Sequence, residues 1–144
     1  IIMETLSGPG FDVDILCDKG ELKSAVPRRR FIKSGTPFKG SLICWPEEII
    51  MLSKKISNSF KLDWLLDIDL MTDKKGNLQL TEINPRPSGG IISSIVAGVP
   101  LLDNLISLSK GEEVKYFLNQ KKELAVVPYT DLRLIDPKFS PTGI

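Results

Sequence analysis

Apolar and charged residues alternate along residues 62–71, a pattern that predicts a half-buried β-strand. Leucine and isoleucine occupy one side of this strand, whereas Asp67 and Asp69 fall on the other side. Residues 73–77 (Asp-Lys-Lys-Gly-Asn) are typical of a turn, and residues 78–83 form a second strand pattern. The two stretches therefore predict a β-hairpin that carries acidic side chains on one face.

Similar patterns predict the other elements of the chain. We expect strands at residues 11–17, 22–32 and 124–127, a weaker strand at 132–135, and helices that begin at Pro46 or span residues 91–96 and 101–109. In the first helix, apolar side chains recur at Ile49, Leu52, Ile56 and Phe60. This spacing places them in one stripe, which indicates a helix face packed against the core.

The register of the hairpin follows from the length of its turn. If residues 74–77 form the loop, counting back along both strands places Asp69 opposite Glu82 and Asp67 opposite Asn84. All four side chains then point to the same face. The Cβ atoms of such cross-strand pairs lie about 5 Å apart, close enough for two carboxylates to share a cation.

The residues that follow the hairpin favour a metal site over a solvated acidic surface. Residues 84–90 (Asn-Pro-Arg-Pro-Ser-Gly-Gly) contain two prolines and two glycines, so they form a loop before any helix can begin. Asp69, Glu82 and Asn84 supply the oxygen ligands that Mg²⁺ prefers when it also binds nucleotide phosphates. The planar guanidinium of Arg86 suits contact with phosphoryl oxygens.

Glu82-Ile83-Asn84-Pro85-Arg86, preceded by Asp69 at this spacing, resembles the metal-binding hairpin of the ATP-grasp superfamily. The superfamily includes carbamoyl-phosphate synthase large subunits, biotin carboxylases and D-alanine–D-alanine ligases. The resemblance implies that Asp69, Glu82 and Asn84 bind Mg²⁺ and that Arg86 contacts the phosphoryl group or an acyl-phosphate intermediate. It also implies an α+β fold, the carboxyl-terminal lobe of ATP-grasp, in which an antiparallel sheet has helices packed on one face and closes over ATP with the other.

The amino end is similar to the segment that joins the two ATP-grasp lobes. The resemblance implies that Glu4 and Leu6 contact the adenine edge, and that Gly8 lets the chain turn into the next strand. The chain departs from the family at Gly10, where many members carry a glutamate that binds the ribose hydroxyls. Replacement of that contact by Asp12 or Asp14 depends on which way each side chain points. The resemblance covers residues 1–110, and residues 111–144 have no assigned role.

An arginine run, Arg28-Arg29-Arg30, lies in the second predicted strand. On a strand Arg28 and Arg30 share a face, and Arg29 lies on the opposite face. One interpretation is that Arg28 or Arg30 binds the triphosphate or an anionic substrate. The other is that these residues lie on a solvated edge strand, where basic side chains discourage aggregation.

Composition limits the alternatives. The 144 residues suffice for one core, and a net charge of +1 argues against a general nucleic-acid-binding protein. No apolar stretch approaches ~20 residues and no signal peptide is visible, so we expect a cytoplasmic protein without a membrane span. Because the chain has no histidine and its two cysteines lack CxxC spacing, zinc binding and histidine-based catalysis are disfavoured.

We expect residues 1–144 to form a partial ATP-grasp domain whose amino-terminal lobe is supplied elsewhere, in cis or in trans. The resemblance implies a parent ligase, similar to carbamoyl-phosphate synthase, that uses ATP with Mg²⁺ (or Mn²⁺) to activate a small carboxylate for attack by an amine or other nucleophile. A homodimer is left open. Two alternatives remain: a non-catalytic nucleotide-binding or regulatory module, and a structural domain with solvated surface acids.

Overall fold

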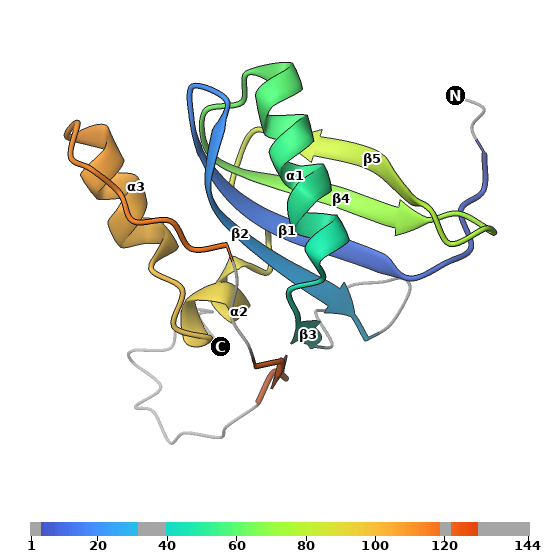
Figure 1. Cartoon of the computed structure of the whole chain (residues 1–144). Coiled ribbons are helices and arrows are strands. Elements are labelled where there is room, and N and C mark those ends of the chain that lie inside the picture. Colours follow the sequence, from blue (N-terminus) through green and yellow to red (C-terminus); the bar gives the residue numbers. More distant parts are fainter. Residues whose placement is uncertain (1–3, 32–39, 119–121, 130–144) are drawn as a thin grey trace, which may run out of the picture.

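The computed structural model describes residues 4–31, 40–118 and 122–129. Its strands form one antiparallel sheet in the order β5-β4-β1-β2-β3-β6 (Figure 1). The strands are β1 (Gly10–Asp18), β2 (Glu21–Arg30), β3 (Ser41–Ile43), β4 (Trp64–Thr72), β5 (Leu78–Asn84) and β6 (Leu124–Val126). The helices are α1 (Glu47–Phe60), α2 (Ile91–Val96) and α3 (Leu101–Ser109). No helix of the described residues is long and apolar enough to cross a membrane.

Most predicted elements are confirmed within a few residues of their expected bounds. The three-residue strand β3 was not predicted, because a strand this short carries no readable alternation. The weak strand predicted at residues 132–135 lies outside the described residues. The α+β class and the antiparallel sheet are confirmed.

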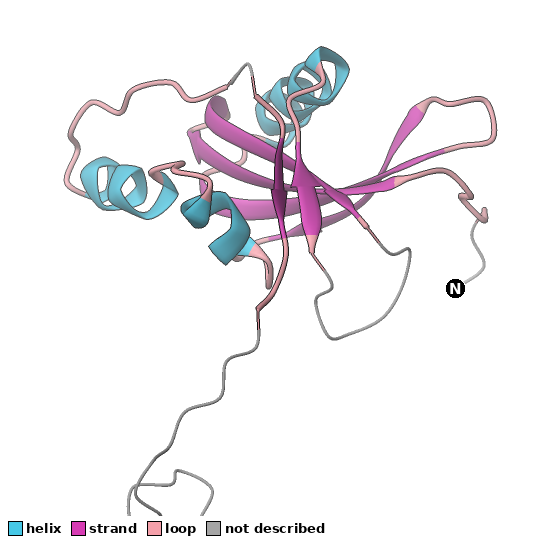
Figure 2. Ribbon diagram, turned by 90° about the horizontal axis from the view of Figure 1, so that it is seen from below, coloured by secondary structure: helices cyan, strands magenta, loops and turns pink. Residues whose placement is uncertain are grey.

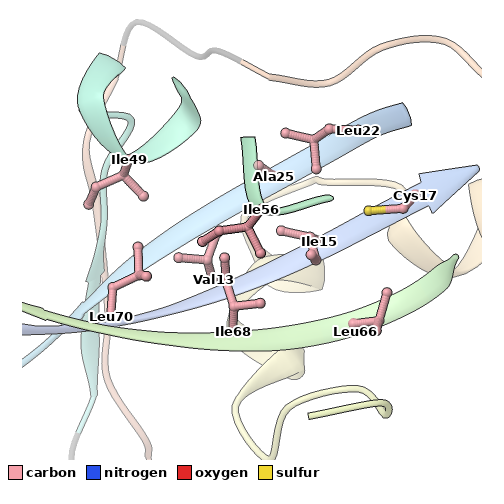
Figure 3. Close-up of a cluster of buried hydrophobic side chains, with 10 residues drawn as sticks. All are labelled: Val13, Ile15, Cys17, Leu22, Ala25, Ile49, Ile56, Leu66, Ile68 and Leu70. Atoms are coloured by element: carbon pink, nitrogen blue, oxygen red, sulfur yellow. The ribbon is translucent and has the colours of Figure 1, made fainter. Parts of the chain in front are cut away.

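One face of the sheet packs against α1 and forms the larger core. Alternate residues of β1 and β4, including Val13, Ile15 and Ile68, contact Ile49 and Ile56 of α1 (Figure 3). All ten residues drawn in Figure 3 are buried apolar side chains from the helix and three adjacent strands. The apolar face of the strands, which repeats every two residues, therefore packs against the apolar face of the helix, which repeats every 3.6 residues, as expected.

The apolar stripe of α1 is shorter than predicted. Leu52 is partly buried against the core, but Phe60 is 61% exposed. The helix ends at Phe60 and is capped by Lys61, which adopts a left-handed conformation with φ of 51°. Phe60, in the last turn of the helix, stays outside the core, whereas Leu62 after the cap packs against it.

The second face of the sheet is divided between an apolar end and a charged end. At the apolar end, Leu16, Val26 and Leu65 pack against Val99 and Leu101, which lie at the start of α3. The prediction that helices pack on one face only is therefore wrong: α1 covers one face, and the segment with α2 and α3 covers part of the other. In Figure 2 the strands lie between α1 and the other two helices.

The hairpin of β4 and β5 has the predicted register at the candidate site. Asp69 pairs with Glu82 and Asp67 with Asn84, as expected. The turn itself is one residue longer than predicted, because Thr72 rather than Asp73 pairs with Leu78 and residues 73–77 form the loop.

A bulge in β5 compensates for this difference. The register shifts between Asp69 and Leu70, since Leu70 pairs with Leu80 and leaves Thr81 as the extra residue. The Thr81 hydroxyl donates a hydrogen bond of 3.0 Å to the Asp69 carbonyl, which fixes the bulge beside the acidic pair. The longer turn and the bulge offset each other, so the predicted pairs are kept and the acids stay on the expected face.

We predict that Ile68→Ala lowers the free energy of unfolding by about 2–5 kcal/mol, because it removes buried methyl groups from the core under α1. Urea denaturation followed by circular dichroism measures this change. Ile92→Ala is the matched control, since Ile92 is 58% exposed, and its effect should stay below about 1 kcal/mol. Equal losses in the two variants would contradict the assignment of this core.

Candidate functional site

Four aspartates converge on the charged end of the second sheet face. Asp12 of β1 pairs with Asp69 of β4, and Asp14 pairs with Asp67. Because residues two apart on a strand share a face, the paired strands place all four carboxylates together. The β2 strand adds Arg28 opposite Asp12 in its register with β1.

Arg30 bridges two of these carboxylates. Its Nε donates a hydrogen bond of 2.8 Å to Asp12 Oδ1, and its Nη2 lies 3.1 Å from Asp69 Oδ2. Burial alone would raise the pKa of Asp12, but the hydrogen bond and the charge of Arg30 hold that pKa below its ordinary value. Arg30 thus neutralises Asp12 and only partly satisfies Asp69.

The negative charge around Asp67 and Asp69 exceeds the positive charge that the two arginines supply. Burial raises the pKa of Asp67 to about 7, and the charges of Asp69 and Asp14 add to the shift. Burial also raises the pKa of Asp69 to about 6, with a contribution from Asp12. The Oδ1 atoms of Asp67 and Asp69 are buried and have no hydrogen-bond partner. Asp67 Oδ1 lies 4.0 Å from Nη2 of Arg28, whereas Asp69 Oδ1 has neither a hydrogen bond nor an ion pair with an arginine.

The predicted metal ligands lie at the end of the hairpin. Glu82 is exposed and directly opposite Asp69, and Asn84 is half-buried opposite Asp67. Among the described residues, no three or more Asp, Glu, His or Cys side chains are arranged to hold a metal ion by themselves. The set formed by Asp69, Glu82 and Asn84 fits a Mg²⁺ ion that takes its remaining ligands from phosphate and water.

Arg86 follows these ligands on the exposed loop between β5 and α2. Its Nη1 donates a hydrogen bond of 2.9 Å to the carbonyl oxygen of Pro87, and no carboxylate of the described residues forms an ion pair with it. The guanidinium therefore retains donors that can bind an anion.

A cavity of about 260 Å³ lies beside the acidic cluster. It is lined by Gly8, Pro9, Gly10, Arg29, Arg30, Phe31 and Met71. The segment before β1 is held there by hydrogen bonds between Gly8 and Thr72 and between Thr72 and Pro9. The cavity thus combines a glycine-rich backbone, an apolar Met71 side chain and two arginines.

The chain matches the family described as ATP-grasp in the biosynthetic pathway with Ter operon over residues 1–132. It belongs to this ATP-grasp family. A comparison with curated protein sequences gives no match.

Solved ATP-grasp structures share the fold at low sequence identity. An L-amino acid ligase from Bacillus licheniformis is 15% identical with a TM-score of 0.63, and the match covers 88% of this chain and 35% of that one. An ADP complex of N5-carboxyaminoimidazole ribonucleotide synthetase is 13% identical with a TM-score of 0.60, covering 86% and 34%.

A third structure, the biotin carboxylase domain of 2-oxoglutarate carboxylase from Hydrogenobacter thermophilus, was solved with MgADP, ADP and bicarbonate. It is 19% identical to this chain with a TM-score of 0.59, and the match covers 76% of this chain and 26% of that one. The ATP-grasp chain described here therefore spans about a third of the length of its structural neighbours or less.

The other predicted ligand contacts of this ATP-grasp chain have different outcomes. Glu4 is exposed and Leu6 is half-buried just before the cavity, but neither lines it. Arg28 is 1% exposed and Arg30 reaches the acidic cluster. Their proposed contacts with nucleotide stay predictions. The edge-strand interpretation of the arginine run is wrong, because β2 lies between β1 and β3.

Asp14 cannot replace the ribose-binding glutamate that is missing at Gly10. Its side chain is fully buried between Arg28 and Ser94. Asp12 points into the same cluster and is held by Arg30. The sequence did not identify Met71 and Arg29 as cavity residues. The available signal was Met71 on the acidic side of β4, two residues after Asp69, but only the sheet brings it beside Gly10.

The charge excess at Asp67 predicts a pH-dependent effect of Asp67→Asn. Since burial raises the folded-state pKa from 3.8 to about 7, ionised Asp67 destabilises the fold. The loss of folding stability begins above the ordinary pKa of 3.8, grows as the pH rises, and is complete above about pH 7. Without added metal, we expect Asp67→Asn to raise the free energy of unfolding by about 1–3 kcal/mol at pH 8 and to change it little at pH 4.

Urea denaturation at the two pH values tests this expectation. Asp103→Asn is the control, because Asp103 is an exposed aspartate on α3 away from the cluster. Its effect should be within about 0.5 kcal/mol at either pH. A stabilisation by Asp67→Asn that is the same at pH 4 and pH 8 would contradict the origin assigned to it.

Proposed function

We propose that this chain is the carboxyl-terminal, nucleotide-binding lobe of an ATP-grasp ligase. The observation that carries the proposal is the cross-strand pair of Asp69 and Glu82, in which a buried Asp69 oxygen has no partner. The cavity beside it would hold the nucleoside, and Arg30 both lines this cavity and contacts Asp69. Membership of the ATP-grasp family supports this assignment.

Asp69, Glu82 and Asn84 would hold a Mg²⁺ ion, with Mn²⁺ as a substitute. When bound, the ion would neutralise phosphate charge and orient the phosphoryl group for transfer. Arg30 partly neutralises the acidic cluster before the ion binds, since it already contacts Asp69. The charge at Asp67 and Asp69 favours a cation over a neutral ligand at this position.

Arg86 would contact the transferred phosphoryl group or an acyl phosphate formed from a carboxylate substrate. Its position on the loop next to Asn84, and its lack of a carboxylate partner among the described residues, support this role. Because the chain has no histidine, the chemistry would rest on charge stabilisation and positioning.

The parent reaction would join a carboxylate to an amine or another nucleophile. A structural neighbour is an L-amino acid ligase, which agrees with such a reaction but shares only the fold at this identity. A carbamoyl-phosphate-synthase-like reaction stays a prediction. The substrate-selecting regions and the second lobe would lie in the two thirds of the neighbours that this chain does not span.

We predict that Mn²⁺ with ADP binds this chain and that Glu82→Gln weakens the affinity about 10- to 100-fold, because the variant loses a charged metal ligand. Isothermal titration and Mn²⁺ electron paramagnetic resonance measure this affinity. Glu48→Gln is the matched control, since Glu48 is exposed on α1 across the sheet from the site. It should bind like the unmodified chain.

Equal affinity of the Glu82→Gln variant and the unmodified chain would overturn the metal assignment. If Mn²⁺ and ADP bound independently of each other, that result would also contradict the metal assignment, because the three protein ligands leave the other coordination positions of the ion to phosphate and water. A non-catalytic regulatory module would give metal–nucleotide binding but no substrate-dependent ADP release by a protein with both lobes.

We also predict that this chain alone releases no ADP from ATP above the rate of a buffer blank, whatever amino acid or carboxylate is added. Phosphoryl transfer needs the phosphates enclosed from both sides, and this lobe covers one side. A coupled-enzyme assay for ADP tests this. Turnover that is abolished by Glu82→Gln would refute the assignment of the chain as a single lobe.

A further inference from the structure

Arg28 occupies the centre of the charged face, where solvent does not reach it. Its side chain is 1% exposed and lies between β1 and the loop that follows β5. The Nε atom is 3.1 Å from Asp14 Oδ2, and Nη2 donates hydrogen bonds of 3.2 Å to Asp14 Oδ1 and 2.6 Å to Ser88 Oγ. A guanidinium held in this way connects the sheet directly to the loop of residues 84–90.

The same carboxylate also contacts the middle of α2. Ser94 is fully buried, and its hydroxyl donates a hydrogen bond of 2.6 Å to Asp14 Oδ2. The pair of Arg28 and Asp14 therefore fixes Ser88 on the loop and Ser94 on the helix. These contacts span the whole segment that leads away from the hairpin.

The loop has few backbone contacts that could fix it otherwise. Pro85 and Pro87 have no N–H to donate. The backbone hydrogen bonds that this segment donates are local: the Arg86 N–H donates to the Asn84 carbonyl at 2.8 Å and the Ile91 N–H donates to the Ser88 carbonyl at 3.3 Å. Side-chain contacts from the sheet must therefore set its position relative to β4.

Gly90 is shaped to accommodate Arg28. A methyl group at this position would overlap the Nη1 atom of Arg28 and approach its Cζ to 3.2 Å. The backbone of Gly90 has φ of −101° and ψ of 8°, which other residues also adopt. Space for the guanidinium, rather than backbone conformation, therefore requires glycine here. At the adjacent Gly89 an added methyl group would meet nothing within 4 Å.

We propose that Arg28, held by Asp14, is a positioning residue that sets the place of the loop that follows Asn84 and carries Arg86. This role rests on the proposed function, because it supposes that Arg86 contacts the phosphoryl group. This positioning role takes the place of the nucleotide contact predicted for Arg28 from the sequence, because the loop that the guanidinium holds also encloses it. Arg28 also lies 3.9 Å from Asp12 and 4.0 Å from Asp67, so it carries positive charge beneath the acidic cluster.

Two adjacent glycines allow a matched test. In Gly90→Ala the methyl group displaces the guanidinium, and in Gly89→Ala it enters open space. Ser88→Ala removes the hydrogen bond to Arg28 without adding volume. We expect Gly90→Ala and Ser88→Ala to increase amide hydrogen exchange at residues 88–91 about tenfold or more, because each loses a buried contact to a charged group.

The exchange of β1 and β4 amides and the urea midpoint should change much less, which separates loop positioning from general destabilisation. Gly89→Ala should exchange like the unmodified chain. In the same variants, Gly90→Ala and Ser88→Ala should weaken binding of Mn²⁺ with ADP about tenfold, whereas Gly89→Ala should not.

Equal loop exchange in Gly90→Ala and Gly89→Ala, or loop exchange in Ser88→Ala equal to that of the unmodified chain, would overturn the proposal. Faster exchange that spreads equally over β1 and β4 would overturn it as well, because Arg28 would then serve only the stability of the sheet. Failure of the unmodified chain to bind Mn²⁺ with ADP would contradict the proposed function instead. The loop-exchange comparison would still decide whether Arg28 positions the loop.

Discussion

The buried ion pair of Arg28 and Asp14 is the interaction on which the charged face depends. It joins β2 to β1 and, through Ser88 and Ser94, joins the sheet to the loop and to α2. Removing one member of such a pair leaves an uncompensated charge in the interior, which costs about 3–5 kcal/mol. Ser94 of α2 covers the pair from the helix side, so the charged contact is enclosed between the sheet, the loop and α2.

The charged face carries more negative than positive side chains. Four aspartates meet two arginines, and the arginines satisfy Asp12 and Asp14 first. The Oδ1 atoms of Asp67 and Asp69 are buried without a hydrogen-bond partner, and the pKa values of the two groups are about 7 and about 6, respectively. A fold normally avoids this arrangement because buried like charges oppose it. A divalent cation and the phosphates that accompany it would complete the cluster, which agrees with the function proposed for this lobe.

One face of the sheet forms the main apolar core, and the other carries the candidate binding site. The α1 face holds a continuous apolar core that depends little on charge. The opposite face carries a smaller apolar cluster at one end and the acids, the arginines and the cavity at the other. A ligand site on the second face can therefore remain open and polar while the first face supplies most of the burial that stabilises the sheet.

The sequence by itself determined the local elements and the acidic hairpin. The alternation around Asp67 and Asp69, with a turn and the residues from Glu82 to Asn84, predicted the pairs Asp69–Glu82 and Asp67–Asn84 correctly, although the longer turn and the bulge that offsets it were not predicted. Only the tertiary structure decided that Arg28 is buried, that Asp12 and Asp14 join the cluster, that Gly90 makes room for a guanidinium and that α2 and α3 lie across the sheet from α1. These features depend on contacts between residues 14 to 80 positions apart. Strand order and packing bring such residues together. The sequence around one residue of such a pair does not indicate which distant residue it will contact.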